Sequence, residues 1–168
     1  MAGAAAQSGA PRLNPSLQKM DLIVGHWTYT GEYKPGPLGP GSKIVGDYDF
    51  HTVLNGFVVE GHTTERAGDA TVHFLEIDRY DPTTQSIVTN LYADDGTHYS
   101  GRITVSGRTA TWMVKFLAAD KEYQLRQSFT ASNDAKTARE YGEISADGKT
   151  WLPFFVASCT RVKSKTVR

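Results

Sequence analysis

The sequence predicts an all-β protein: a single antiparallel up-and-down barrel of about ten strands, closed at one end by a short helix. Three observations lead to this prediction. Segments of alternating apolar and polar residues follow one another along most of the chain. Most joints between them are short and carry hairpin-turn residues, such as Asn55-Gly56. Helix signals nearly vanish after Gly25.

The chain length fits one domain. With 168 residues it can bury a substantial core, but it is short for two domains. We expect a disordered Ala/Gly/Ser leader over 1–13, the barrel over 14–162 and a basic tail over 163–168. The leader lacks the features of a secretory signal, and no run of about 18 apolar residues could span a membrane. These features predict a cytoplasmic protein.

Charge and cysteine content exclude several classes of function. Eighteen basic side chains balance eighteen acidic ones, so neither nucleic acid nor a membrane surface is expected as a partner. The single cysteine, Cys159, rules out an intramolecular disulfide, a cysteine-based zinc cluster and a CxxC redox pair. We expect Cys159 to be a small apolar residue packed on a late strand.

A short helix is expected over 14–24. Asn14 is a suitable N-cap, Pro15 fits the first helical position, and Gly25 can end the helix. The apolar face of this helix would carry Leu17, Met20 and Val24.

Consecutive strands are expected from residue 26 onward. Hairpin-linked strands form a meander, and closing it into a barrel removes the two unpaired edges. A sandwich of about eight strands is the competing fold, but it needs long crossover connections, and only the loop over 34–42 is long enough. The expected strands cover 26–33, 43–54, 57–66, 70–81, 86–93, 97–106, 108–118, 122–131, 136–145 and 150–162.

The start and end of the barrel segment carry a pattern known from other proteins. Gly25-His26-Trp27 follows the expected helix, and Arg161 lies near the end of the last strand. This arrangement resembles the calycin superfamily, which includes the lipocalins and fatty-acid-binding proteins. The resemblance implies that Trp27 plugs the barrel end and that Arg161 packs across its ring. Independently of it, Gly25 would let the chain leave the helix with a positive φ.

Three further motifs narrow the resemblance. "LNGFVVE" at 54–60, "YDPTTQSIV" at 80–88 and "DGKTW" at 147–151 follow the Gly-x-Trp in this order. Together they resemble a bacterial calycin-like domain family of unknown function over about residues 17–162.

The aromatic residues predict a ligand in the barrel lumen. Eight Tyr, seven Phe and three Trp are spread over almost every expected strand. A barrel of about ten strands is too wide for side chains to fill, which leaves room for a small hydrophobic or amphipathic molecule. The candidate ligand-binding residues are Tyr29, Tyr48, Phe50, His62, Glu76, Asn90, Tyr92, Trp112, Arg126 and Tyr141.

The direction of Arg126 stays open at the level of the sequence. If it faces inward with Gln124 and Ser128, it could hold a carboxylate, as inward Arg and Tyr residues do in calycins of the fatty-acid-binding type. On the other strand parity, Arg126 points to water, and Tyr123, Leu125, Gln127 and Phe129 face inward.

No catalytic motif appears, and we assign no catalytic residue, metal or cofactor. Phosphate-binding glycine loops, nucleophile elbows and paired-histidine zinc motifs are absent from the sequence. Two weaker ideas concern the five separate histidines: a metal site of His62, His73 and Glu76, and haem ligation as in the related nitrobindins. Glu60 and His62 share a strand face, either as an acid–base pair or as two solvated residues.

Three functions therefore remain open. The leading prediction is a carrier that binds its ligand in the lumen. The second is an enzyme in the same cavity, a cyclase, isomerase or hydrolase of a small apolar metabolite. The third is a scaffold with a solid core. The sequence allows a homodimer through the 34–42 loop or an exposed strand but marks no surface for it.

Overall fold

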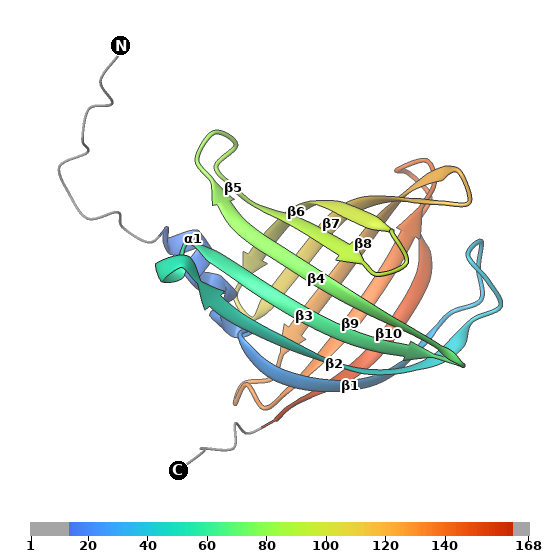
Figure 1. The fold of residues 1–168 in the computed structure, drawn as a ribbon, viewed down its shortest axis with the longest axis horizontal. Coiled ribbons are helices and arrows are strands. Elements are labelled where there is room, and N and C mark those ends of the chain that lie inside the picture. The colour runs from blue at the N-terminus through green and yellow to red at the C-terminus, as the bar shows by residue number, and fades with distance from the viewer. Residues whose placement is uncertain (1–13, 163–168) are drawn as a thin grey trace.

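The computed structural model describes residues 14–162. The leader and the basic tail predicted for 1–13 and 163–168 lie outside the described residues. Over the described range the chain forms a closed antiparallel β-barrel of ten strands with a short helix at its N-terminal side (Figure 1). The predicted fold class is thereby confirmed.

Each strand pairs with the next one along the chain, and β10 returns to pair with β1. This last pairing closes the barrel and excludes the two-sheet sandwich. Observed and expected strand ends agree within two residues. The strands are β1 (Gly25–Tyr33), β2 (Ser42–Val53), β3 (Val58–Ala67), β4 (Ala70–Asp81), β5 (Ser86–Ala93), β6 (His98–Ser106), β7 (Thr109–Ala118), β8 (Lys121–Ala131), β9 (Thr137–Ser145) and β10 (Leu152–Arg161).

The N-terminal helical segment is shorter and tighter than expected. It consists of α1 (Pro15–Gln18) and the 3₁₀ turn η1 (Lys19–Leu22). The Asn14 side chain caps α1 by accepting a hydrogen bond from the backbone N–H of Ser16. The buried side chains of this segment are spaced by three residues: Leu17 in α1, Met20 in η1, and Ile23 directly after it. Val24, expected on the same face, is partly buried and packs against the core beside them.

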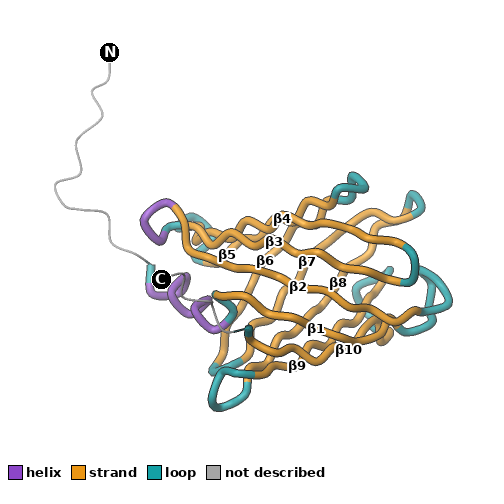
Figure 2. Tube along the Cα trace, turned by 60° about the horizontal axis from the view of Figure 1, so that its bottom comes forward, coloured by secondary structure: helices purple, strands orange, loops and turns teal. Residues whose placement is uncertain are grey.

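Both helical turns and the 3₁₀ turn η2 (Leu54–Gly56) gather at one end of the barrel (Figure 2). The loop between β1 and β2 lies at the opposite end (Figure 1). The two barrel ends therefore differ: helical turns cover one, and hairpin loops surround the other.

Within residues 14–162 no helix is long and apolar enough to cross a membrane.

Side chains alternate between the lumen and the outer surface. On β1, Trp27 and Tyr29 are buried, whereas Thr28 and Thr30 are exposed. An inward glycine makes space for a neighbouring ring: a Cβ on Gly61 would lie 2.2 Å from Cε1 of Phe50. Aromatic rings from several strands can therefore lie side by side inside the barrel.

Candidate ligand-binding site

The floor of the barrel is a contact between Trp27 and Arg161. The Trp27 side chain is fully buried and donates its indole N–H to the carbonyl of Ile23 at 2.9 Å. The guanidinium carbon of Arg161 lies 4.3 Å from the centre of the Trp27 ring. The same guanidinium donates to the carbonyl oxygens of Leu22 and Val24, which ties the last strand to the helical segment.

Gly25 makes this approach possible. It has a φ of +117°, and a Cβ there would lie 2.8 Å from Nη1 of Arg161. Any other residue would therefore meet both backbone strain and a steric conflict. Gly25 lets the chain turn from the helical segment into β1 directly beneath the Arg161 head group.

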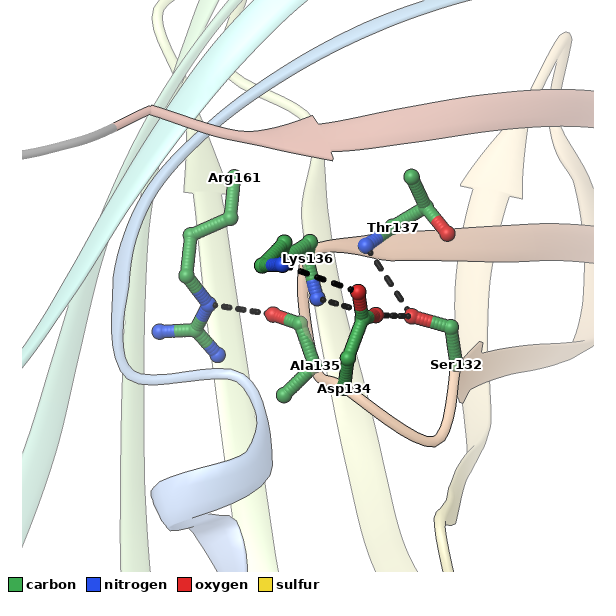
Figure 3. Close-up of polar contacts among 6 residues, drawn as sticks. All are labelled: Ser132, Asp134, Ala135, Lys136, Thr137 and Arg161. Carbon is green, nitrogen blue, oxygen red and sulfur yellow. Dashed lines mark hydrogen bonds and ion pairs between the residues drawn. The ribbon is translucent and has the colours of Figure 1, made fainter.

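The turn between β8 and β9 supplies another acceptor for Arg161 (Figure 3). Nε of Arg161 donates to the carbonyl of Ala135 at 2.9 Å. The carboxylate of Asp134 accepts from Ser132 Oγ and from the backbone N–H of Lys136, and these hydrogen bonds lower the pKa of Asp134. Because these bonds fix the turn, the Ala135 carbonyl is held in place for Arg161.

Above this floor the barrel encloses a cavity of about 140 Å³. A cavity of about that size, lined by apolar side chains, is known to bind benzene. Most of its walls are aromatic or aliphatic, with a few polar groups, which is typical of small-molecule sites. The lining residues are Ile23, Tyr29, Tyr33, Ile44, Tyr48, Phe50, Thr63, Glu65, Phe74, Glu76, Leu91, Tyr99, Trp112, Val114, Leu125, Gln127, Phe129, Glu140, Phe154 and Phe155.

Glu65 on β3 is held by two tyrosines of β1. The hydroxyl of Tyr29 donates to Oε2 at 2.8 Å, and that of Tyr33 donates to Oε1 at 2.6 Å. Burial, reinforced by the Glu65 charge, raises the pKa of both tyrosines, so both remain neutral donors. The carboxylate is thus fixed in position inside the barrel.

Glu76 on β4 forms a second polar group deeper in the wall. It is 6% exposed, and its Oε1 accepts from Trp112 Nε1 at 2.6 Å and from Thr89 Oγ1 at 3.2 Å. Burial raises its pKa. Burial and the nearby Glu76 charge also raise the pKa of the fully buried Asp78 well above its usual value.

Glu140 on β9 is the third carboxyl group in the cavity wall. The Tyr48 hydroxyl donates to its Oε1 over a long distance of 3.5 Å. Burial, with smaller contributions from the charges of Glu65 and Glu76, raises the pKa of Glu140 to about 8. This carboxyl can therefore exchange a proton close to neutral pH.

These features can be compared with known proteins. Residues 15–161 match a family described as "Protein of unknown function (DUF1579)". The chain belongs to the DUF1579 family. The sequence resembles a bacterial domain family of unknown function with a barrel fold. Membership in the DUF1579 family and the observed barrel confirm this part of the resemblance. None of the curated proteins matches the chain.

Two solved structures have a similar fold to this DUF1579 protein. The crystal structure of Rv2717c from M. tuberculosis aligns with a TM-score of 0.64 and 17% identity, over 90% of this chain and 100% of the other. The S-type phycobiliprotein lyase CPES from Guillardia theta aligns with a TM-score of 0.59 and 10% identity, over 88% and 93%. At such identities the likeness shows the fold alone, which is the closed antiparallel β-barrel.

The structure divides the predicted ligand-binding residues of the DUF1579 barrel into two sets. Five line the cavity, and the other five lie on the outer face, where they cannot contact a ligand in the lumen. The cavity-lining set is Tyr29, Tyr48, Phe50, Glu76 and Trp112. The outer set is His62, Asn90, Tyr92, Arg126 and Tyr141.

Arg126 shows why the outer set was misplaced. Its Nη2 lies 2.6 Å from Oε2 of Glu143, and its guanidinium carbon lies 4.4 Å from the centre of the Trp151 ring. Its neighbours Leu125 and Gln127 line the cavity instead. The strand parity that turns Arg126 to water is the correct one, so its expected contact with a ligand carboxylate is not formed.

Asn90, Tyr92 and Tyr141 are turned outward for the same reason. On β5 the inward positions fall on Thr89 and Leu91. The ring of Tyr92 instead stacks on His98 with centroids 4.9 Å apart, and Oδ1 of Asn90 lies 3.2 Å from Nε2 of that histidine. Tyr141 is exposed, while the preceding Glu140 lines the cavity.

The proposed metal set of His62, His73 and Glu76 is not assembled. His62 and His73 lie on the outer face, whereas Glu76 faces the lumen. His62 lies instead with His51 and Glu60: Oε1 of Glu60 is 2.8 Å from His62 Nε2 and 3.6 Å from His51 Nε2. This exposed group has ligand types that suit zinc. In the described part of the chain no histidine lines the cavity, so the haem alternative lacks an axial ligand there.

Several cavity residues were missed at the level of the sequence. They are Tyr33, Glu65, Tyr99 and Glu140. Strand parity was the available signal for Tyr33, because it lies four residues from Tyr29 and two from Gly31, on the same face as Trp27. Glu140 follows the same rule, since the inward residues around it are Ala138 and Gly142.

Proposed function

We propose that this DUF1579 protein binds a small hydrophobic or amphipathic molecule in its barrel lumen. The observation that carries the proposal is the cavity of about 140 Å³, whose aromatic walls hold a small number of polar groups. A scaffold with a solid core would leave no such space. The likeness to other barrels supports the fold of the carrier and not the identity of its ligand.

The ligand enters from the end opposite the helical turns. Trp27 and Arg161 close the floor, and Ile23 covers the cavity from below. Tyr33, Tyr99 and Phe154 line the cavity and are only partly buried, in keeping with positions near its entrance.

One observation favours an enzyme as a second candidate function. Glu140 faces the cavity with a pKa of about 8, so it can take or give a proton near neutral pH. This property suits an isomerase, cyclase or hydrolase of a small apolar metabolite. One of the similar barrels is named a phycobiliprotein lyase, which shows that this fold occurs in a protein named as an enzyme.

The test of lumen binding uses two substitutions on one strand. Val114 lines the cavity, and its neighbour Met113 points outward. We expect toluene to bind the wild-type protein and Met113→Phe in calorimetric titrations, but not Val114→Phe, because the added ring fills the cavity. Circular dichroism confirms that both variants fold. Equal binding to Val114→Phe, or no binding to the wild type, would contradict the proposal.

Native mass spectrometry of the gently purified protein addresses the ligand itself. We expect a small molecule to accompany the wild-type chain and to be lost from Val114→Phe. Denaturing extraction then identifies its chemical class. Cytoplasmic location and pairing into a homodimer stay predictions, which fractionation and the native mass would test.

A further inference from the structure

We propose that the molecule bound in the lumen is a small organic cation, an amine or quaternary ammonium group attached to an apolar ring or chain. This inference rests on the proposed function and adds the chemical class of the ligand. It starts from the charge of the cavity walls and from the aromatic rings between the charges.

The cavity carries acidic groups without basic ones. Glu65, Glu76 and Glu140 come from three different strands, β3, β4 and β9, and all line the same space. Among the described residues no Lys, Arg or His lines it. Arg161 is engaged beneath the floor by Trp27 and backbone carbonyls, and Arg126 is paired with Glu143 outside. A cation inside the cavity would therefore meet attraction alone, and an anion would meet repulsion.

The surroundings of these carboxyl groups also favour a cationic ligand. Trp112 and Thr89 both donate to Oε1 of Glu76, and the buried carboxyl of Asp78 lies against the same side chain, so this part of the wall holds two acidic groups and no basic one. The contact between Glu140 and Tyr48 is long, at 3.5 Å. A buried carboxyl group with unused acceptors favours a ligand that brings N–H groups or positive charge.

Aromatic faces lie between the carboxyl groups. The ring centroids of Tyr29 and Tyr48 are 5.7 Å apart, and those of Tyr48 and Phe50 are 5.5 Å apart. All three residues line the cavity. Rings of this kind attract an organic cation through their π faces, and the attraction grows when water is excluded. Apolar walls and carboxyl groups together thus suit a cation with an apolar body.

Cation binding should be coupled to proton release. Glu140 faces the neutral hydroxyl of Tyr48, the thiol of Cys159, the amide of Gln127 and, across the lumen, the carboxyls of Glu65 and Glu76. Burial raises its pKa to about 8, so it is largely protonated at pH 7 in the empty cavity. A bound cation stabilises the ionised form and displaces this proton. Affinity for a permanent cation should therefore rise as the pH rises from 6 to about 9.

The experiment compares three probes of similar size by calorimetric titration of the full chain. Phenyltrimethylammonium is the permanent cation, tert-butylbenzene is its uncharged isostere, and phenylacetate is the anion. At pH 8 we expect the cation to bind at least about ten-fold more tightly than the isostere, and phenylacetate to bind weakest. Titrations at pH 7, where Glu140 is largely protonated, in two buffers of different ionisation enthalpy should show a proton released with the cation.

Matched variants test whether the cation binds at the carboxyl groups of the cavity. Glu140→Gln should weaken cation binding about ten-fold, remove most of the proton release, and leave binding of tert-butylbenzene unchanged. Glu143→Gln is the control, because Glu143 lies on the same strand but pairs with Arg126 outside the barrel. Glu65→Gln provides a second test on another strand in case Glu140→Gln folds poorly.

The outcomes separate this inference from the function on which it rests. If tert-butylbenzene or phenylacetate binds as tightly as the cation, the lumen is a binding site but the cationic class is wrong. If the cation binds equally well to Glu140→Gln and Glu65→Gln, its site is not the acidic lumen, and the inference is overturned. If none of the three probes binds while toluene does, the inference is overturned and the proposed function stands; if toluene does not bind either, both proposals fail.

Discussion

Trp27 and Arg161 lie directly opposite each other in the β1–β10 pair, and the guanidinium carbon of Arg161 is 4.3 Å from the centre of the Trp27 ring. This contact therefore lies where the first strand pairs with the last, and it closes the barrel floor. Hydrogen bonds from the same guanidinium to Leu22 and Ala135 extend the contact to the helical segment and the β8–β9 turn. Four separate parts of the chain meet at this point.

Removing the Trp27 ring should strongly destabilise the protein. Trp27→Ala deletes a fully buried aromatic side chain, and we expect the free energy of unfolding in urea to fall by about 3–5 kcal/mol. The matched control is Trp151→Ala, because Trp151 also stacks on an arginine, Arg126, but on the outer surface. That change should cost less than about 1 kcal/mol. A loss at Trp27 no larger than at Trp151 would contradict the closing role.

Arg161→Lys tests whether the shape of the guanidinium matters beyond its charge. Lysine keeps the positive charge but cannot reach Leu22, Val24 and Ala135 with one planar group. We expect a loss of about 1.5–3 kcal/mol in the free energy of unfolding. Unchanged stability would show that the charge alone is sufficient.

Glu140 should make stability depend on pH. Its pKa is about 8 in the folded protein and near 4.5 in the unfolded chain, so the folded state binds this proton more tightly. Its contribution is full below pH 4.5 and is lost as the pH rises towards 8, by up to about 4 kcal/mol. Urea unfolding across this range should show a smaller fall for Glu140→Gln than for the wild type. Parallel pH curves would show that Glu140 is not buried as described.

Arg126→Met should leave ligand binding intact. The side chain pairs with Glu143 and stacks on Trp151 outside the barrel, so no ligand in the lumen reaches it. Calorimetric titration with toluene should give the same affinity as for the wild type. A marked loss of affinity in a well-folded variant would place the binding site on the outer surface.

The strands could be predicted well because their signals are local. Turn residues such as Asn55-Gly56 and Asp147-Gly148 mark hairpins, and a hairpin fixes its two strands as antiparallel neighbours. Closure of the barrel could be predicted because it removes the two unpaired strand edges that an open meander would leave. The floor contact between Trp27 and Arg161 was expected from the resemblance to calycins, not from local pattern.

The lumen was harder to predict because each strand offers two faces. In Arg139-Glu140-Tyr141 the acidic residue faces inward and the aromatic one outward, which reverses the usual preference for burial. The small residues Ala138 and Gly142 were the signal for this parity, and the aromatic Tyr141 beside them points to the opposite one. Charged residues inside a barrel depart from the binary pattern, and such departures are expected at functional sites.

The most direct test of lumen binding is an NMR titration of the labelled protein with toluene, the uncharged probe of the lumen. The indole N–H of Trp112 and the side-chain amide of Gln127 belong to the cavity wall, whereas Trp151 and Gln124 lie outside it. Binding in the lumen predicts that the signals of Trp112 and Gln127 shift together with added probe while those of Trp151 and Gln124 stay fixed. Shifts confined to Trp151 and Gln124, or no shifts at all, would contradict the account.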